Sequence, residues 1–483
     1  MNRRQFLGRA AALAAASLSA CSLPLERTAR APKKVIVLGA GLAGLAAGLE
    51  LAQAGHDVVI LEARGRAGGR VQTLREPFSD GLHADAGAHL IPNQHHLTLK
   101  YARLFKLAIE PSTPLFEARL FYVHGQRVVA NYGVDVEWPF DLTPEERKLG
   151  RLGMWERYIS AALGDLGDVT APGWPADHRL EKYDRMTAAD LLRSRGASPG
   201  AVALLRVGYL DLIGDGIDSY SALQMLHNLA LRQMETVRYA IRGGTDLLAK
   251  AFADRLAGRI RYESPVVRIE PGERSASVVV GRNGQHQRLT ADSIVCTLPF
   301  SVLRQIDVSP SFSPQKQRAI EELPYTSIAR VYLQFRRKMW TTENLYVTAA
   351  TDLPIKWLFE HTINQPGPRG ILEAQAAGIE GRRVTRMTEG DRIQFALDHV
   401  ERVFPGIRGD FERGTSKAWD EDPWARGAFA YFRPGQMLSL LPHIARAEGR
   451  VHFAGEHTSP WSAWMQGALE SGLRAAREIN EAL

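Results

Sequence analysis

Cysteine is scarce in this sequence. The chain of 483 residues contains two cysteines, Cys21 and Cys296. Two cysteines cannot build the disulfide framework that holds small secreted domains together, so a hydrophobic core has to stabilise the fold. With 45% apolar residues, the chain has ample material for such a core, and its length suggests two or three domains.

Long apolar runs are also missing. A membrane-spanning helix needs about 20 apolar residues in a row, and the apolar run near the N-terminus is shorter than that. The N-terminus instead combines RRQFL at residues 3–7, a short Ala/Leu run and LSAC at residues 18–21. This order predicts an export signal over residues 1–21 and a tether over residues 22–32, and hence an exported, periplasmic protein. RRQFL resembles a twin-arginine signal, and LSAC resembles a lipoprotein box that would anchor the protein to a membrane through lipidated Cys21. The alternative is an ordinary cleaved signal in which Cys21 has no role.

Neither sign of charge is in large excess. The formal net charge is +7, and removal of residues 1–20 deletes three arginines and no acid, which lowers the charge to +4. Such a small excess does not indicate a nucleic-acid partner. Four histidines lie between residues 83 and 96, but their spacing matches no standard metal site, so no bound metal is expected.

The most informative pattern lies in residues 33–70. VIVL at residues 35–38 and DVVILE at residues 57–62 are short apolar runs, and GAGLAG at residues 39–44 opens the Ala/Leu-rich stretch between them. A strand, a glycine turn, a helix and a second strand predict one βαβ unit that binds a dinucleotide.

The three glycines of this turn each meet a physical need. Gly39 permits the sharp turn, Gly41 lets backbone N–H groups approach a pyrophosphate, and Gly44 lets the helix pack closely on the strand. The helix N-terminus that follows favours an anion. A carboxylate at the end of the second strand is placed to accept hydrogen bonds from a ribose diol. The predicted contacts of this unit are Gly39, Gly41, Leu42, Ala43, Gly44 and Glu62.

Residues 61–70 read LEARGRAGGR, and two glycines flanked by arginines suit a second loop around phosphates. Here the chain resembles the flavin-containing amine oxidase family, the superfamily of monoamine oxidases and L-amino acid oxidases, whose signature is LEAR-x-R-x-GGR. The resemblance recurs at residues 85–92, 241–246, 291–340 and 451–479. It implies FAD as the cofactor; the alternative interpretation is a nicotinamide-binding domain with a chance arginine loop.

The resemblance also implies a fold class and a domain plan. The fold is expected to be α/β, with a Rossmann-like FAD-binding domain beside an α+β substrate-binding domain. The FAD-binding domain would be discontinuous, over residues 33–95, 241–300 and 425–483. The substrate-binding domain would combine a helical region, residues 96–240, with a sheet, residues 301–424. The residue patterns predict helices over residues 96–107, 143–163, 187–195, 201–232, 247–256 and 388–403, strands over residues 260–269, 292–299, 331–335 and 370–376, and a hairpin over residues 275–289.

Further cofactor contacts follow from the family. The backbone of Val267 would contact the adenine, Glu456 would meet the pyrophosphate–ribityl region, and a helix over residues 466–480 would point its positive end at flavin O2. Ala428 stands where some members carry a flavin-linking cysteine, so noncovalent binding is expected. The additional contacts carried over are Ala63, Arg64, Gly69, Arg70, Gly87, Ala88, Val267, Gly455, Glu456 and Met465.

The family also implies an aromatic cage for the substrate nitrogen. Trp464 aligns with one wall of this cage; the alternative is that Trp464 is an ordinary packing residue. Phe429 or Trp357 is the candidate for the opposite wall. Tyr209, in the helical region, is expected in the core.

Two positions depart from the family pattern. In the amino-acid oxidases of this family an arginine follows Gly87-Ala88 and binds the substrate carboxylate, whereas this chain has His89, which could do so only when protonated or as a neutral donor. Most members carry a lysine that links through water to flavin N5 and helps oxygen react, whereas this chain has Arg330. The alternative interpretation is that Arg330 is an ordinary surface arginine without a role at the flavin.

The expected function is oxidation of an amine. A hydride leaves the α-carbon for flavin N5, the imine hydrolyses, and O2 reoxidises the flavin with formation of H2O2. Trp464, Arg330, Phe429 and His89 are the expected catalytic residues. An L-amino acid oxidase, an amine dehydrogenase that uses an acceptor other than oxygen, and a non-catalytic flavoprotein scaffold remain the alternatives.

Overall fold

The computed structural model describes residues 31–112, 120–130, 136–233, 235–282, 284–343 and 348–482. The predicted export signal, Cys21 and most of the predicted tether lie outside the described residues. Within the described ranges, no helix combines the length and the apolar character that a membrane crossing requires.

The predicted βαβ unit is present. β1 (Lys34–Leu38), α2 (Leu42–Gln53) and β2 (Asp57–Leu61) follow one another, and Val37 pairs with Ile60 in the parallel ladder. The two strands belong to a five-stranded parallel sheet with the order β10-β2-β1-β14-β23. β1 is apolar along most of its length because both faces of the parallel sheet are covered, one by α2 and the last helix of the chain and the other by the small sheet described below. The other strands are β10 (Ile260–Arg261), β14 (Ser293–Cys296) and β23 (Val451–Phe453).

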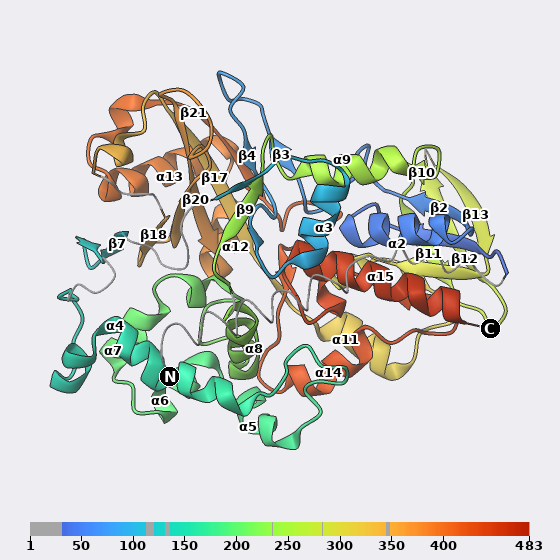
Figure 1. The fold of residues 1–483 in the computed structure, drawn as a ribbon, viewed down its shortest axis with the longest axis horizontal. Helices are drawn as coiled ribbons and strands as arrows, with labels where there is room; N and C mark the ends of the chain where they lie inside the picture. The colour runs from blue at the N-terminus through green and yellow to red at the C-terminus, as the bar shows by residue number, and fades with distance from the viewer. Residues whose placement is uncertain are drawn as a thin grey trace, which may run out of the picture.

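The last helix packs against the first helix of this unit. α15 (Met465–Glu481) lies beside α2, as the red and blue helices of Figure 1 show. The approach is very close, since a Cβ atom on Gly472 would lie 2.3 Å from the carbonyl oxygen of Ala43. The two ends of the described chain therefore form one layer on the parallel sheet.

A small mixed sheet extends this half of the molecule; its β11–β15 pair is parallel and its other two pairs are antiparallel. Its order is β13-β12-β11-β15, and the predicted hairpin forms its β12–β13 pair. The prediction of one strand over residues 260–269 is wrong. The strand conformation is interrupted at Glu263, which has a φ of 51°, and at Pro265, which lacks an N–H. β10 and β11 therefore join different sheets. The strands are β11 (Val266–Glu270), β12 (Ala276–Arg282), β13 (Gln285–Ala291) and β15 (Asp307–Val308).

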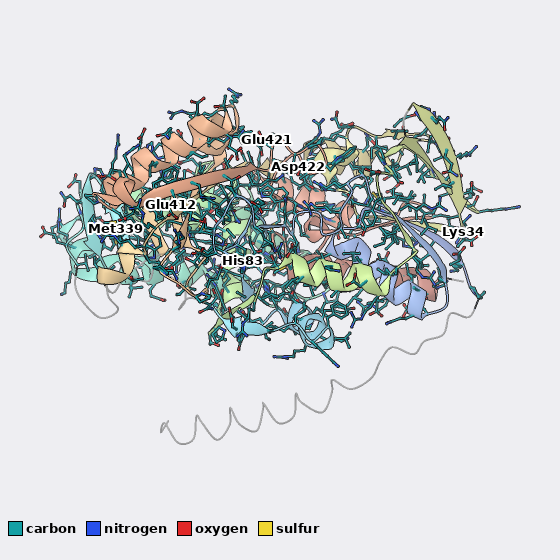
Figure 2. The ribbon with its side chains drawn as sticks, turned by 90° about the horizontal axis from the view of Figure 1, so that it is seen from above. Lys34, His83, Met339, Glu412, Glu421 and Asp422 are labelled. Carbon is teal, nitrogen blue, oxygen red and sulfur yellow. The ribbon has the colours of Figure 1, made fainter. Side chains whose placement is uncertain are left out.

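A seven-stranded mixed sheet forms the other half, with the order β21-β17-β20-β19-β18-β7-β8. Its β18–β7 pair is parallel and its other pairs are antiparallel. β7 and β8 come from the region predicted to be helical, so that prediction is wrong for these residues. Lys34 and Met339 mark the opposite ends of the molecule in Figure 2, one in each half. The strands are β7 (Leu120–Val123), β8 (Gln126–Val129), β17 (Ile328–Phe335), β18 (Thr348–Thr351), β19 (Trp357–Glu360), β20 (Gly370–Ala377) and β21 (Phe411–Ala418).

Helices form a layer below the mixed sheet in Figure 1. The prediction of one helix over residues 201–232 is wrong, because Gly208, Gly214 and Gly216 adopt positive φ angles and a short 3₁₀ turn, Tyr209–Leu212, lies among them. Two separate helices, α7 and α8, result. The helices of this layer are α4 (Pro144–Tyr158), α5 (Glu181–Asp184), α6 (Ala188–Ser194), α7 (Pro199–Arg206) and α8 (Ala222–Arg232).

The remaining elements connect these layers. The helices are α3 (His96–Leu104), α9 (Asp246–Arg255), α10 (Phe300–Leu303), α11 (Pro314–Glu322), α12 (Gly378–Thr385), α13 (Glu389–Val403) and α14 (Gln436–Ile444). The short strands are β3 (Thr73–Leu74), β4 (Ala84–Asp85), β5 (Ile91–Pro92), β6 (Ile109–Pro111), β9 (Arg238–Ile241), β16 (Tyr325–Thr326) and β22 (Phe429–Ala430).

Candidate active site

A cavity of about 380 Å³ lies at the carboxyl ends of the parallel strands. Its wall includes Gly39 after β1, Glu62 after β2, Thr297 after β14 and Gly455 after β23. It continues to the mixed sheet and to α8. Ligands of doubly wound sheets bind at this edge, where the loops of neighbouring strands diverge.

The glycine turn borders the cavity directly. Gly39 has a φ of 98°, and Gly41 precedes α2 without a side-chain cap. A Cβ atom on Gly41 would meet no atom within 4 Å, so a side chain there would enter the cavity. Gly44 does not line the cavity; a Cβ on it would lie 2.0 Å from the carbonyl oxygen of Gly39. Gly41, Leu42 and Ala43 thus present the N-terminus of α2 to a ligand.

Backbone groups fix the carboxylate of Glu62. One oxygen accepts a hydrogen bond from the N–H of Ala40 at 2.7 Å, and the other accepts one from the N–H of Arg64 at 2.9 Å. The side chain of Arg64 forms an ion pair with Asp422. Because Glu62 and Ala63 line the cavity, a ribose diol there would meet an oriented acceptor.

The second glycine loop lies against the first. The N–H of Gly68 donates to the carbonyl oxygen of Ala40 at 2.8 Å, and a Cβ on Gly69 would lie 3.3 Å from the Cα of Gly41. Arg66 holds this loop by donating to the carbonyl oxygen of Gly69 at 2.9 Å. The two loops predicted to surround phosphates, residues 39–44 and residues 61–70, therefore lie side by side and form one continuous surface.

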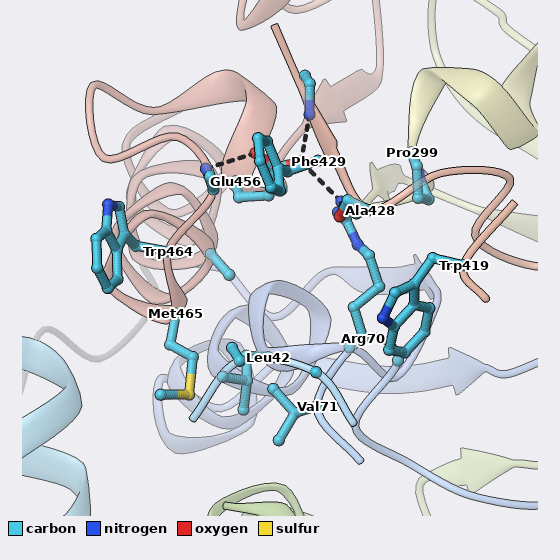
Figure 3. Close-up of a pocket in the computed structure, with 18 of the residues that line it drawn as sticks. Leu42, Arg70, Val71, Pro299, Trp419, Ala428, Phe429, Glu456, Trp464 and Met465 are labelled. Carbon is cyan, nitrogen blue, oxygen red and sulfur yellow. Dashed lines mark hydrogen bonds and ion pairs between the residues drawn. The ribbon is translucent and has the colours of Figure 1, made fainter. Parts of the chain in front are cut away.

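Arg70 joins this surface to the C-terminal segment. Its guanidinium donates to the carboxylate of Glu456 at 2.9 Å and to the carbonyl oxygen of Ala428 at 2.7 Å (Figure 3). The second oxygen of Glu456 accepts from the N–H of Ala463 at 2.8 Å. Burial alone would raise the pKa of Glu456, but the charge of Arg70 holds it below its usual value.

The aromatic candidates line the same cavity. Trp464 stands just before α15, and its ring meets His95 edge-on with 4.8 Å between centroids. Phe429 in β22 and Trp357 in β19 also line the cavity, as does Met465 at the start of α15. Figure 3 shows Trp464 and Phe429 reaching the cavity from different elements.

Three neighbouring strands of the mixed sheet supply a polar wall. Gln375 in β20 pairs with Arg330 in β17 on one side and with Trp357 in β19 on the other. Arg330 donates to Gln375 at 3.0 Å and to the carbonyl oxygen of Gly87 at 2.7 Å, and it forms an ion pair with Glu373 at 3.2 Å. Its side chain is 14% exposed, so the alternative of a surface arginine is wrong. Burial by itself would lower the pKa of Arg330. The charge of Glu373 is the main effect in the opposite direction, and the pKa is raised overall, so the guanidinium stays charged.

Burial and the groups behind this wall keep His89 neutral. Glu373 also contacts the ring nitrogen Nε2 of His361 at 2.7 Å. Burial would raise the pKa of Glu373, but Arg330 and His361 lower it to about 2. Burial, followed by the electrostatic effects of the neighbouring His361 and Arg330, lowers the pKa of His89 to about 3. This lowered pKa favours the neutral donor over the protonated ring, and the role of His89 as a carboxylate ligand stays a prediction.

Some positions differ from the sequence-based expectations. Val267 does not line the cavity; its side chain is 39% exposed, and Val266 and Ser264 line the cavity instead. The contact between the Val267 backbone and adenine stays a prediction. Tyr209 packs against the core, as expected, and also lines the cavity, as do Arg232 and Arg238. The family resemblance implies that residues 219–234, which include Arg232, are the nearest approach of the helical region to the ligand. Among the residues described, no cluster of three or more His, Cys, Asp or Glu forms a metal site.

The profile of the flavin containing amine oxidoreductase family matches residues 42–480. The protein belongs to this family. It is 35% identical over 470 residues to a putative L-amino-acid oxidase of Bacillus subtilis (strain 168), which covers 93% of this chain and 95% of that relative. It is 32% identical over 467 residues to an L-amino-acid oxidase of Siganus canaliculatus, with coverage of 92% and 85%.

A solved structure has the same fold. The chain superposes on cyclohexylamine oxidase from Brevibacterium oxydans IH-35A with a TM-score of 0.81 at 23% identity, covering 93% of this chain and 99% of that one. The predicted α/β fold with a Rossmann-like sheet and a mixed substrate sheet is confirmed. As a flavin amine oxidoreductase, the protein acts on CH–NH2 groups and catalyses the FAD-dependent oxidation of an amine or an amino acid.

The site of this amine oxidoreductase fits a flavin dinucleotide. The open space over Gly41 matches a pyrophosphate, the oriented carboxylate of Glu62 matches a ribose, and the long cavity reaches from there to Trp464. The N-terminus of α15 offers the positive end of a helix dipole where Met465 lines the cavity.

Proposed function

We propose that the protein oxidises a primary or secondary amine, or an amino acid, with noncovalently bound FAD, and that O2 accepts the electrons and forms H2O2. The observation that carries this proposal is the single cavity that joins the glycine turn at Gly41, the Arg70–Glu456 pair and the ring of Trp464. FAD, when bound, supplies the acceptor for the hydride that leaves the substrate α-carbon.

The residues of the chain supply binding, orientation and exclusion of water. Glu62 and the N-terminus of α2 would hold the dinucleotide, and Arg70 would orient the loops around it. Trp464, with Phe429 or Trp357, would hold the neutral substrate nitrogen between ring faces. The released imine hydrolyses to an aldehyde or keto acid and ammonia or an amine.

Noncovalent binding is supported by the residues around Ala428. The carbonyl oxygen of Ala428 accepts a hydrogen bond from Arg70, and none of the cavity-lining residues that the structure describes is a cysteine. Cys296 lies in β14, where burial raises its pKa to about 11. Release of all the yellow colour into the supernatant after acid precipitation supports this part; colour retained in the pellet contradicts it.

The main experiment is anaerobic bleaching of the flavin with a panel of amines and amino acids. Loss of the oxidised flavin absorbance with at least one member, followed by return of colour and stoichiometric H2O2 on admission of air, is the expected result. A flavin that no member of the panel bleaches would contradict the proposal.

Arg330 favours a second candidate, an amine dehydrogenase that uses an acceptor other than oxygen. It stands where most members of the family carry the lysine that helps oxygen react, and its ion pair with Glu373 keeps it charged and fixed. Rapid reduction of an artificial dye without peroxide would favour this candidate over the oxidase.

We also propose that the chain is exported and attached to a membrane through Cys21. The RRQFL and LSAC motifs of the N-terminus support this proposal. Labelling of the expressed protein with radioactive palmitate, lost in a Cys21→Ser variant, is the expected result. An unlabelled protein contradicts the anchor, and a protein that stays in the cytoplasm contradicts export.

A further inference from the structure

One buried carboxylate contacts two of the segments that carry candidate aromatic walls. Oε2 of Glu456 accepts hydrogen bonds from the N–H of Ala463 at 2.8 Å and from the hydroxyl of Ser462 at 3.0 Å. Oε1 accepts hydrogen bonds from Arg70 at 2.9 Å and from the N–H of Ala430 at 3.4 Å. The side chain of Glu456 is 7% exposed, and these donors hold its carboxylate in one place.

The contacts of Oε2 lead to Trp464. Ala463 directly precedes Trp464 and has a φ of 68°, in the left-handed region that alanine rarely occupies. Such a conformation persists only where surrounding contacts stabilise it, and the hydrogen bond from the N–H of Ala463 to Glu456 is such a contact. The ring of Trp464 also meets His95, with 4.8 Å between centroids. The direction in which Trp464 enters the cavity therefore depends on Glu456.

The contacts of Oε1 lead to Phe429. Phe429 and Ala430 form β22, and Ala428 precedes them. The N–H of Ala430 donates to Glu456. The carbonyl oxygen of Ala428 accepts a hydrogen bond of 2.7 Å from Arg70. The ion pair of Arg70 and Glu456 thus contacts the backbone on both sides of Phe429, and Figure 3 shows the four side chains Arg70, Ala428, Phe429 and Glu456 together at the pocket.

Phe429 and Trp464, called here the aromatic pair, therefore have a common support. Trp357 differs, because it lies in β19, where the ladders to β18 and β20 hold it. Of the two candidates for the wall opposite Trp464, Phe429 is the one whose position is tied to the carboxylate of Glu456. The spacing of the aromatic pair accordingly depends on an ion pair whose arginine belongs to the second glycine loop.

We propose that the ion pair of Arg70 and Glu456 sets the spacing of the aromatic pair and thereby restricts the site to amines with an unhindered nitrogen. Glu456 is a positioning residue in this role, because it acts on the substrate through the two rings. This inference rests on the proposed function, since it concerns the amines that the same site accepts. Rings held at a fixed spacing exclude a nitrogen that carries bulky groups on both sides, because packed side chains resist overpacking.

The test compares two amines that cannot be oxidised, because no α-carbon in either of them carries a hydrogen. The nitrogen of tert-butylamine carries one bulky group, and the nitrogen of di-tert-butylamine carries two. Their dissociation constants are measured from the perturbation of the flavin spectrum, with the holoenzyme at saturating FAD and a fixed pH. The parent protein should bind tert-butylamine at least about tenfold more tightly than di-tert-butylamine.

Ala463→Gly tests the link to Trp464 and leaves the ion pair of Arg70 and Glu456 in place. Glycine populates both signs of φ, so the turn no longer fixes the direction of Trp464. The preference for tert-butylamine should fall at least about threefold, while the dissociation constant of FAD changes less than about twofold. Lys106→Gly is the matched control, because Lys106 has a φ of 57° and lies exposed after α3. It should leave the preference unchanged.

Glu456→Asp tests the carboxylate itself. Aspartate keeps the negative charge beside Arg70 but is one methylene shorter, so it cannot reach Arg70 and Ala463 together. The preference for tert-butylamine should fall to about twofold or less. If Glu456→Asp does not fold or does not bind FAD, the result for Ala463→Gly decides.

A preference in the variants equal to that of the parent overturns the proposal, as does a parent protein that binds both amines equally or binds neither. Failure of every amine and amino acid to bleach the flavin overturns the proposed function instead. The titration with tert-butylamine does not depend on turnover, so it still decides the positioning role of Glu456.

Discussion

Arg70 and Glu456 form an ion pair of 2.9 Å although 386 residues separate them in the chain. Arg70 ends the second glycine loop, and Glu456 follows β23 of the parallel sheet. Both side chains line the cavity. This pair therefore makes the shape of the cofactor site depend on the docking of the C-terminal segment onto the first βαβ unit.

We expect Arg70→Met to weaken both the fold and the flavin site. The substitution leaves the carboxylate of Glu456, 7% exposed, without its cationic partner, which costs about 3 kcal/mol of unfolding free energy. Purified R70M should also contain less FAD. The control is Arg75→Met, because the Arg75–Asp246 pair is 48% and 32% exposed and contributes about 1 kcal/mol or less. Denaturant unfolding and the ratio of flavin to protein absorbance measure both effects; equal behaviour of the two variants would contradict the assigned role of Arg70.

Two glycines of the same turn should respond differently to alanine. Gly41→Ala places a methyl group in open cavity space, so we expect normal folding and at least about tenfold weaker FAD binding. Gly44→Ala places a methyl group 2.0 Å from the carbonyl oxygen of Gly39, so we expect loss of stability by about 3 kcal/mol or more. Thermal unfolding of the two apoproteins, followed by FAD titration, separates the effects. A stable G44A protein with normal FAD affinity would show that the turn tolerates more than the geometry allows.

We expect Arg330→Lys to change the preference between electron acceptors. Lysine keeps the positive charge beside Glu373 but lacks the planar fork that also contacts Gln375 and the carbonyl oxygen of Gly87. The ratio of peroxide formation to dye reduction should rise in R330K. R337K is the control, since the side chain of Arg337 is 69% exposed in its pair with Asp410. An unchanged ratio in R330K would remove Arg330 as the residue that limits the reaction with oxygen.

Buried neutral histidines should make the fold sensitive to acid. Burial lowers the pKa of His95 and of His457 to about 3, well below the value of 6.5 in an unfolded chain. Below pH 6.5 the unfolded chain binds protons that the folded protein does not, so stability is fully present above pH 6.5 and is lost as the pH falls toward 3.

The variant His95→Phe tests this dependence at one position. It keeps an aromatic ring beside Trp464 but removes one titrating group. Between pH 6 and pH 4, the slope of unfolding free energy against pH should fall by up to about 1.4 kcal/mol per pH unit. Denaturant unfolding at several pH values measures the slope. An identical slope in H95F and the parent would mean that His95 is already charged in the folded protein.

The parts of the site that depend on neighbours in sequence were predictable. The turn at Gly39 and Gly41, the carboxylate of Glu62 and the loop ending at Arg70 follow from glycine geometry, apolar periodicity and fixed spacing, all of which act over a few residues. The first βαβ unit and the hairpin formed by β12 and β13 were predictable for the same reason.

Long-range packing decided the rest. No local pattern shows that Tyr209, Arg232 and Arg238 border the same cavity as Trp464, because these segments come together only in the folded chain. The same holds for Arg330, whose buried position depends on Glu373 in a neighbouring strand. The sequence by itself determined the cofactor unit, because turns and helix termini are short-range structures. The tertiary structure decided the substrate wall, because its charges come from segments that only the packed core brings together.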